Sequence, residues 1–427
     1  MDDERTIHLP LEVLDKCDEC GQSGDSHRLR ICSYCGERAY CSTECQKKDW
    51  PTHKASCGKS KTDRIPLTAF YPFLACLAEA CRFHPSKPHH PAQTHAILNS
   101  PNPGSQPARF PDGTEAVLVL LGESVPFTVD PAAWWPTAIS SPVRSKFFRR
   151  LQREGYLLSL VLSLCIALLQ EVYTTTSAPD GSRRIRLQYK NSPISDFGIL
   201  KGAASVTNQD QLAYFNLSDL TFRAGQDPKE HYWLYFKTLS GQEITLDCGM
   251  FTFNFGLVVH GAPYGDSIPL PIPPATAPAF VFDPVTARTT PHIAEARERF
   301  SVLRDAGLQQ ALSGPEIDWS AVYDFMDRVA GGACPDIEKD LVKVWSRDNA
   351  RALQKVFQRR AWTRWPAEPA VDIEADPGEM HGRPPVEDEE WWNYMERWNR
   401  KYNRGRVTRD ELGNAFRRFQ ARRAGAE

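Results

Sequence analysis

The sequence of 427 residues predicts a small metal-stabilised module, followed by an α+β domain and a mainly helical C-terminal region. Three observations predict this fold class. Residues 17–57 concentrate cysteines in closely spaced pairs, residues 115–262 alternate helical and strand patterns, and the final third places apolar residues at helical spacing. A hydrophobic fraction of 41% and an aromatic fraction of 11% are enough for the later segments to form a packed core.

The N-terminal module contains eight candidate metal ligands in four pairs. They are Cys17 and Cys20, Cys32 and Cys35, Cys41 and Cys45, and His53 and Cys57. Two cysteines separated by two residues suit a tight knuckle around one ion, whereas ligands separated by three residues share one face of a helix. Eight such ligands fill two tetrahedral zinc sites and leave no position for water or substrate. The spacing therefore predicts two structural Zn²⁺ ions, and by itself it leaves sequential and interleaved sites equally open.

Disulfide bonds are the alternative explanation for so many cysteines. An oxidising compartment would call for a signal peptide, but the chain starts with the acidic residues MDDER and has no apolar segment there. The odd cysteine number within 17–57 and the matching histidine also favour zinc. The apolar run 157–169 is too short for the ~20 residues that a bilayer requires. We therefore expect an intracellular protein of the nucleus or cytoplasm, without a membrane partner.

The residues between the ligands resemble those of a known family. The run from Tyr40 to Cys57, with Gln46, Asp49 and Trp50 among its ligands, closely resembles the MYND-type zinc finger. The resemblance covers residues 17–57, and the segment that follows is similar to the region after the finger in many fungal MYND proteins. It implies interleaved sites, the first formed by Cys17, Cys20, Cys41 and Cys45, the second by Cys32, Cys35, His53 and Cys57.

The resemblance also implies a function. MYND fingers typically bind short proline-containing peptides of partner proteins, often transcriptional regulators, and Gln46 and Trp50 match the residues near the groove. Packing of Trp50 over the zinc helix is an equally good explanation for that side chain. A formal net charge of −2 gives no general case for binding nucleic acid. We therefore expect a protein or peptide partner.

These observations predict an interaction adaptor and no enzyme, with no catalytic residues. SET-type methyltransferases contain such a finger, but they need a cofactor segment ahead of it, and only 16 residues precede Cys17. Their Asn-His-Ser-Cys-type segment and later tyrosine also have no counterpart here. The alternative is an enzyme of unknown class in the 231–260 region, where Cys248 could be a nucleophile with His231 or His260. A buried thiol explains Cys248 more simply.

Composition divides the chain into eight segments. They are an N-terminal tail (1–16), the zinc finger (17–57), a helix with a Pro-rich loop (58–114), the α+β domain (115–262), a Pro-rich linker (263–291), a helical region (292–366), an acidic linker (367–390) and an aromatic and basic helical tail (391–427). The prolines of 268–274 favour a stiff spacer over a ligand for the finger.

Periodicity predicts the elements within these segments. In chain order we expect a charged connector (58–66), a helix (67–84), a loop (85–111), a buried strand (116–121), an amphipathic helical lead-in (145–152), a buried helix (157–169), a strand (184–189), a three-strand meander (231–236, 244–248, 251–259) and helices at 293–312, 315–330 and 337–362. In the loop, His89, His90 and His95 have no thiolate or carboxylate partner nearby, which favours solvated histidines over a metal site.

The tail shows aromatic residues at helical spacing. Trp391, Met395, Trp398 and Tyr402 fall on one face of a helix, and many arginines follow them. Such a face most often docks onto its own domain, and the alternative is a helix that binds a partner or RNA.

Overall fold

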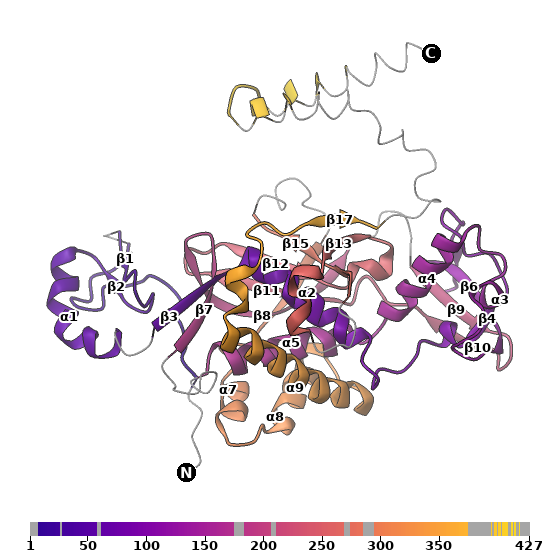
Figure 1. Ribbon diagram of the computed structural model, residues 1–427, viewed down its shortest axis with the longest axis horizontal. Helices are drawn as coiled ribbons and strands as arrows, with labels where there is room; N and C mark the ends of the chain where they lie inside the picture. The colour runs from indigo at the N-terminus through magenta and orange to yellow at the C-terminus, as the bar shows by residue number, and fades with distance from the viewer. Residues whose placement is uncertain are drawn as a thin grey trace. The chain divides into compact units, whose positions relative to one another are not determined.

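The computed structural model describes residues 7–25, 28–57, 61–174, 183–205, 211–268, 274–284 and 294–374, together with scattered positions from 394 to 418. The chain divides into two compact units, Met1–Ala375 and Asp376–Glu427. The first unit contains the finger and an α+β body with helices in its C-terminal part, which confirms the predicted fold class (Figure 1).

The finger is built from two short strands and one helix. They are β1 (Arg30–Ile31), β2 (Ala39–Tyr40) and α1 (Thr43–Cys57). The strands pair antiparallel, with Arg30 opposite Tyr40. The buried cluster of the finger consists of Tyr40 and four of the cysteines, with little other apolar surface. A module of this size without an apolar core needs metal to fold.

The body is organised around a seven-stranded sheet. Its strands are β3 (Lys61–Pro66), β7 (Arg183–Tyr189), β8 (Ser192–Ala204), β11 (His231–Thr238), β12 (Glu243–Asp247), β15 (Phe280–Phe282) and β16 (Ala294–Ser301). The order is β15-β12-β11-β8-β7-β3, and β16 also pairs with β8. Only β3 and β7 run parallel; the other pairs are antiparallel. The 13-residue strand β8 is therefore the centre to which three other strands attach.

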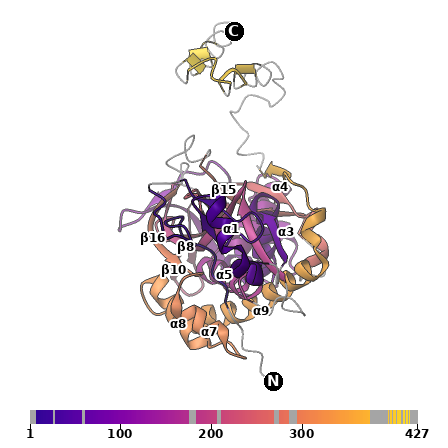
Figure 2. The ribbon, with the colours of Figure 1, turned by 90° about the vertical axis from the view of Figure 1, so that its left-hand side faces the viewer.

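Five helices complete the main core with this sheet. They are α2 (Leu67–Arg82), α5 (Leu157–Val172), α7 (Ala306–Ser313), α8 (Trp319–Ala330) and α9 (Asp336–Arg359). The last three lie together on one side of the body, next to α5 (Figure 2). The helix α5 is buried along almost its whole length, which explains its apolar sequence. No single described helix could cross a membrane, although α4 (Ser141–Arg153) and α5 taken together, bent by 65°, have the required length and composition.

A second, smaller core lies in the same unit. Its five-stranded sheet contains β4 (His95–Ile97), β5 (Ala108–Arg109), β6 (Glu115–Ser124), β9 (Leu212–Asn216) and β10 (Thr221–Ala224), and its helices are α3 (Pro131–Trp134) and α4 (Ser141–Arg153). Trp134, Trp135 and Phe147 fill this core. Ser140 caps α4 by accepting a hydrogen bond from the amide of Val143. Figure 1 shows these elements grouped at one end of the body.

Short elements complete the first unit. A three-stranded sheet contains β13 (Leu257–His260), β14 (Thr276–Pro278) and β17 (Val371–Ile373). The short 3₁₀ helices are η1 (Pro91–Gln93), η3 (Met250–Phe253), η4 (Ala262–Ser267) and η5 (Ala361–Arg364). Two strands, β14 and β15, thus lie within the segment predicted as a Pro-rich linker, and β17 within the predicted acidic linker.

Several predicted elements were wrong. Residues 294–301 form strand β16 instead of the start of a helix, because pairing with β8 outweighs the local pattern, and α7 begins only at Ala306. The predicted meander has two strands. Residues 250–253 form η3, the following Asn254 has a left-handed conformation, and β13 joins a different sheet. The predicted connector contains β3, which pairs with β7.

The predicted loop also has more structure than its composition indicated. It contains η1 and β4, and His90 is buried rather than solvated. The imidazole Nδ1 of His90 accepts a hydrogen bond from the amide of Ala92, 3.2 Å away, and caps η1. Proline at the first position of η1 suits such a start.

The second unit is described at scattered positions only. Tyr394, Trp398 and Tyr402 are helical, and the rings of Tyr394 and Trp398 lie 6.2 Å apart. The hydroxyl of Tyr394 donates to the carbonyl of Ala415. Trp391 and Met395, the other members of the predicted aromatic face, lie outside the described residues. The role of this face stays a prediction.

Candidate metal centre and interaction surface

The first group of ligands brings Cys17, Cys20, Cys41 and Cys45 together, with their sulfur atoms within 4.8 Å of one another. The Sγ of Cys41 is 3.5 Å from the Sγ of Cys20 and 3.5 Å from that of Cys45. Four sulfurs at the usual Zn–S distance of about 2.3 Å lie roughly 3.8 Å apart in a tetrahedron. The donor set and its dimensions therefore fit one Zn²⁺ ion.

The second group brings Cys32, Cys35, His53 and Cys57 together, and all four are buried. The Sγ atoms of Cys32 and Cys57 are 3.9 Å apart. The Nε2 of His53 is 3.4 Å from the Sγ of Cys35, which identifies Nε2 as the ligand atom. The two groups confirm two zinc sites and the interleaved arrangement, because the first and third pairs meet in one group and the second and fourth in the other.

The two Cys-x2-Cys knuckles have the same local geometry. Gly21 and Gly36 have φ angles of +72° and +70°, a region that glycine adopts without a steric penalty. Their amides donate to the carbonyls of Cys17 and Cys32, 2.8 Å away in both knuckles. Burial opposes ionisation of these two cysteines, but backbone hydrogen bonds lower the pKa of Cys17 to about 6 and that of Cys32 to about 7. The first cysteine of each knuckle is thus held toward the thiolate form that binds metal, whereas burial raises the pKa of Cys35.

A buried hydrogen bond supports the ligand-bearing helix. The hydroxyl of Tyr40, on β2, donates to the Oδ2 of Asp49, on α1, over 2.6 Å. Asp18 accepts from the guanidinium of Arg38 at 3.1 Å and from the amide of Ala39, which joins the first knuckle to β2. These contacts hold strand, knuckle and helix in the positions that both ligand groups require.

This geometry agrees with the comparison with known families. Residues 17–57 match the family model described as the MYND finger. These residues form a MYND finger. It is a zinc-binding protein-interaction module, which makes a protein the expected kind of partner. No solved structure matches the chain.

The finger is also similar to part of a known enzyme. A hypoxia-inducible factor prolyl hydroxylase of Caenorhabditis elegans is 47% identical over 47 residues, which are 11% of this chain and 6% of that relative. This finding corrects the prediction that the chain is not an enzyme, because a closely similar finger occurs within an enzyme. The similarity is confined to the finger and does not show that the whole chain is an enzyme.

The residues predicted to contact a peptide lie on helix α1. Trp50 is 41% exposed, and its ring packs edge-on against the ligand His53, with the centroids 5.9 Å apart. Gln46 is half-buried one helical turn earlier. Tyr34, between the ligands Cys32 and Cys35, is a second exposed aromatic residue of the finger, and it is 50% exposed.

The finger also contacts the body. Arg186 of β7 is buried, and its Nη2 lies 3.1 Å from the Oε1 of Glu37, next to the second knuckle. The same guanidinium donates to the carbonyl of Val172 and lies over the ring of Tyr173. Glu37, two residues after the ligand Cys35, therefore links the second zinc site to Arg186, which is anchored in the main core.

The structure does not assemble the predicted cysteine nucleophile. Cys248 is 1% exposed within the main core, and burial raises the pKa of its thiol to about 12. The Nε2 of His231 lies 2.7 Å from the Oδ2 of Asp247, so this imidazole is oriented toward a carboxylate. His260 is exposed on β13 and faces Asp372. The simpler explanation of Cys248 as a buried thiol agrees with this burial.

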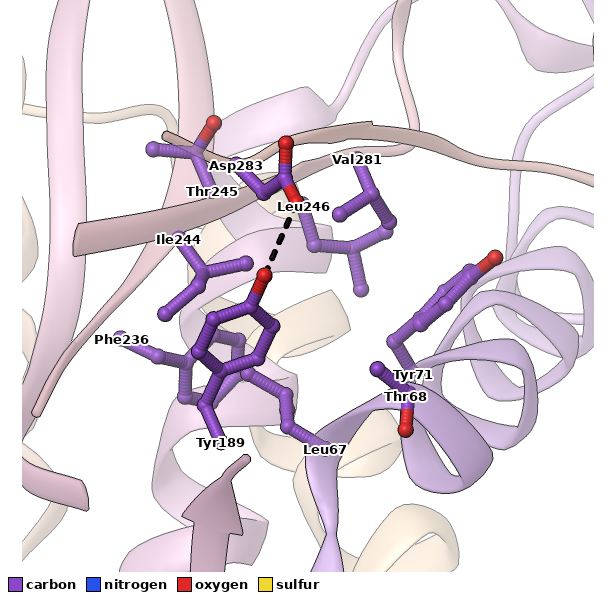
Figure 3. Close-up of a pocket in the computed structure, with 10 residues that line it drawn as sticks. All are labelled: Leu67, Thr68, Tyr71, Tyr189, Phe236, Ile244, Thr245, Leu246, Val281 and Asp283. Carbon is purple, nitrogen blue, oxygen red and sulfur yellow. Dashed lines mark hydrogen bonds between the residues drawn. The ribbon is translucent and has the colours of Figure 1, made fainter. Parts of the chain in front are cut away.

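A small cavity in the body is lined mainly by apolar residues. It has a volume of about 70 Å³ and lies between α2 and strands of the main sheet (Figure 3). The hydroxyl of Tyr189 points across it and donates to the Oδ2 of Asp283 over 2.8 Å, as Figure 3 shows. Tyr71 lies on the opposite wall. A cavity this small is far below the 300–1,000 Å³ typical of ligand pockets.

Proposed function

We propose that the finger binds short proline-containing segments of partner proteins, including regulators of transcription, through Trp50 and Gln46. One observation carries this proposal: the indole of Trp50 stands exposed on the helix that supplies three of the zinc ligands. Aromatic side chains offer large, flat apolar surfaces on which proline rings pack well. Packing against His53 holds the indole in one orientation and lowers the entropy lost on binding.

The test uses the full zinc-loaded chain and an array of proline-containing peptides. We expect Trp50→Ala to weaken binding of the peptides selected by the wild type by about 2 kcal/mol or more, roughly thirtyfold. Gln46→Ala should weaken the binding of the same peptides less, because it removes hydrogen bonds and leaves the aromatic surface intact. The zinc content of both variants should remain two ions per chain, since neither residue is a ligand.

Tyr34→Ala is the matched control, because Tyr34 is another exposed aromatic residue of the finger. It should keep wild-type affinity for the same peptides. Equal loss in Tyr34→Ala and Trp50→Ala would contradict the assignment of Trp50, and full binding by Trp50→Ala would reject the proposal.

A further inference from the structure

A cavity of ligand size lies beside helix α4, among the elements of the smaller core (Figure 1). Its volume is about 360 Å³, within the range of 300–1,000 Å³ that is typical of small-molecule sites. One wall comes from the segment 127–134, which contains the loop after β6 and helix α3, and another from residues 141–149 of α4. None of its lining residues belongs to the finger, so the cavity needs an explanation of its own.

Aromatic rings form one continuous wall of this cavity. The indole of Trp134 is buried, and its Nε1 donates to the carbonyl of Ala92 over 2.8 Å, which fixes the plane of the ring. The ring of Phe148 lies edge-on to this indole, with the centroids 5.3 Å apart, and the ring of Phe127 lies 5.6 Å from that of Phe148. The three rings line the cavity and hold one another in place.

Phe127 offers open aromatic surface at this wall. It is 47% exposed and lies on the loop between β6 and α3, where its ring also contacts that of His89 at 4.4 Å. Val129 and Pro131, close by in the same segment, add apolar lining. An exposed ring at the edge of an apolar hollow suits a ligand that itself contains a ring.

The charge of the lining is positive. Arg144 and Arg149 both line the cavity, and no acidic residue is found among its described lining residues. Arg149 forms an ion pair with Glu374, so its charge is already balanced. The Nε of Arg144 donates to the carbonyl of Trp135 over 3.0 Å, and within the described residues Arg144 forms no ion pair. A guanidinium held in this way keeps its terminal N–H groups for a carboxylate.

Two hydroxyl groups lie on the same side of α4 as Arg144. Ser141 and Ser145 are one helical turn apart, both are exposed, and both line the cavity. In the part of the chain that the structure describes, neither hydroxyl makes a hydrogen bond. Serine hydroxyls can donate to carboxylate oxygens, so the polar side of the cavity offers donors and a positive charge together.

We propose that this cavity binds a small aromatic carboxylic acid, whose ring packs against Phe127, Phe148 and Trp134 and whose carboxylate pairs with Arg144. Such acids are negatively charged at neutral pH, because a carboxyl group has a pKa of about 4. The aromatic wall selects a ring over a small anion, and the unbalanced arginine selects the acid over a neutral compound of the same shape.

The test is isothermal titration of the full zinc-loaded chain with 3-phenylpropionate and, separately, with 2-naphthoate, at equal ionic strength. Each acid is compared with its amide, which keeps the ring and loses the charge, and with acetate, which keeps the charge and lacks the ring. We expect at least one acid to bind saturably, with one molecule per chain. Its amide and acetate should bind roughly tenfold more weakly or worse, because each loses one of the two interactions.

Two variants locate the site. Arg144→Gln should weaken binding of that acid about tenfold and leave the weaker binding of its amide unchanged, because only the ion pair is lost. Phe127→Ala should weaken binding of the acid by a similar factor, roughly tenfold, because part of the aromatic wall is lost.

The matched controls lie outside the lining of the cavity. Phe83 is also 47% exposed, and Arg347 is an exposed arginine of α9, so Phe83→Ala and Arg347→Gln should bind the acid as the wild type does. The comparison of acid with amide uses the wild type alone and holds even where a variant does not fold. The proposal would be overturned by no saturable binding of either acid, by equal affinity for acid and amide, or by wild-type affinity in Arg144→Gln.

Discussion

Buried charged side chains of the body depend on specific partners, and Glu79 of α2 is the clearest example. Its carboxylate accepts hydrogen bonds from Arg153 at 3.0 and 2.6 Å and from Arg82 at 3.3 Å, and all three residues are buried. Burial alone would raise the pKa of Glu79, but the two guanidinium groups hold it below its ordinary value. The cluster joins α2 to α4, so it links the two cores.

We expect Glu79→Gln to destabilise the chain by about 3–5 kcal/mol, because it leaves two guanidinium groups without their counter-charge. Chemical denaturation followed by tryptophan fluorescence measures this loss. Glu295→Gln, which alters an exposed glutamate of β16, is the control and should stay within about 0.5 kcal/mol of the wild type. A loss below 1 kcal/mol in Glu79→Gln would contradict the role given to this carboxylate.

His90 gives the fold a second, pH-dependent contribution. Burial, with the nearby charges of Arg223 and Lys87, lowers its pKa from 6.5 to about 3. The unfolded chain therefore binds a proton at this residue between pH 6.5 and 3, while the folded chain does not. Stability must fall as the pH is lowered through this window.

We expect the wild type to lose about 1.4 kcal/mol more per pH unit below about 6.5 than His90→Asn does. The asparagine side chain can still accept the hydrogen bond from the amide of Ala92 that Nδ1 accepts in the wild type. Denaturation curves at several pH values from 7 to 5 measure the difference. Parallel pH profiles for the two proteins would show that His90 is not the group responsible.

At the scale of the elements, α5 decides the stability of the main core. It packs most extensively against α9 and also against α2, α8 and β11. Its apolar residues are buried on all sides, so a single truncation leaves a cavity that neighbouring side chains can fill only partly.

We expect Leu168→Ala, on α5, to cost about 2–5 kcal/mol of unfolding free energy. Leu98→Ala removes the same atoms from a side chain that is half-exposed, and it should cost less than 1 kcal/mol. Thermal denaturation of both variants beside the wild type measures the two effects. Similar losses in both would contradict the central place of α5.

Local and non-local elements differ in how well the sequence predicts them. The buried helix α5 and the strand β7 could be predicted from their apolar patterns, because each pattern is complete within the element. Strand β16 could not, since its sequence AEARERFS is polar and helix-like and becomes a strand only by pairing with β8. The same holds for β3, whose partner lies more than a hundred residues later.

At the scale of the whole molecule, finger and body have separate cores. The zinc ligands form their own cluster, and no described ligand belongs to the core around α5. Metal removal should therefore unfold the finger, which loses roughly 10–16 kcal/mol of binding free energy, and leave the body folded.

We expect elemental analysis to find two zinc ions per chain, and a strong chelator to remove both. Amide hydrogen exchange should then become fast in residues 43–57 and stay slow in α5 and α9. One ion or none in the native chain would contradict the metal centre. Simultaneous loss of protection in α5 would contradict the independence of the body core.

The zinc centre and a polar cavity of about 450 Å³ in the body differ in how far the sequence reveals them. The eight zinc ligands could be predicted because they fall within 41 residues and their spacing reflects the tetrahedral geometry directly. The residues that line this cavity come from the corner between α4 and α5, from β10 and from the loop between α8 and α9, so no local pattern connects them.

The pairing of β3 with β7 has a practical consequence for dividing the chain. Strand β3 is the outermost strand of the main sheet and begins only a few residues after the last zinc ligand, Cys57. A fragment that starts at Leu67, where α2 begins, would lack β3 and leave β7 with unpaired backbone groups. Exposed strand edges of this kind recruit other chains and aggregate. A fragment of the body that starts between residues 57 and 61 retains β3 as the edge strand of the main sheet.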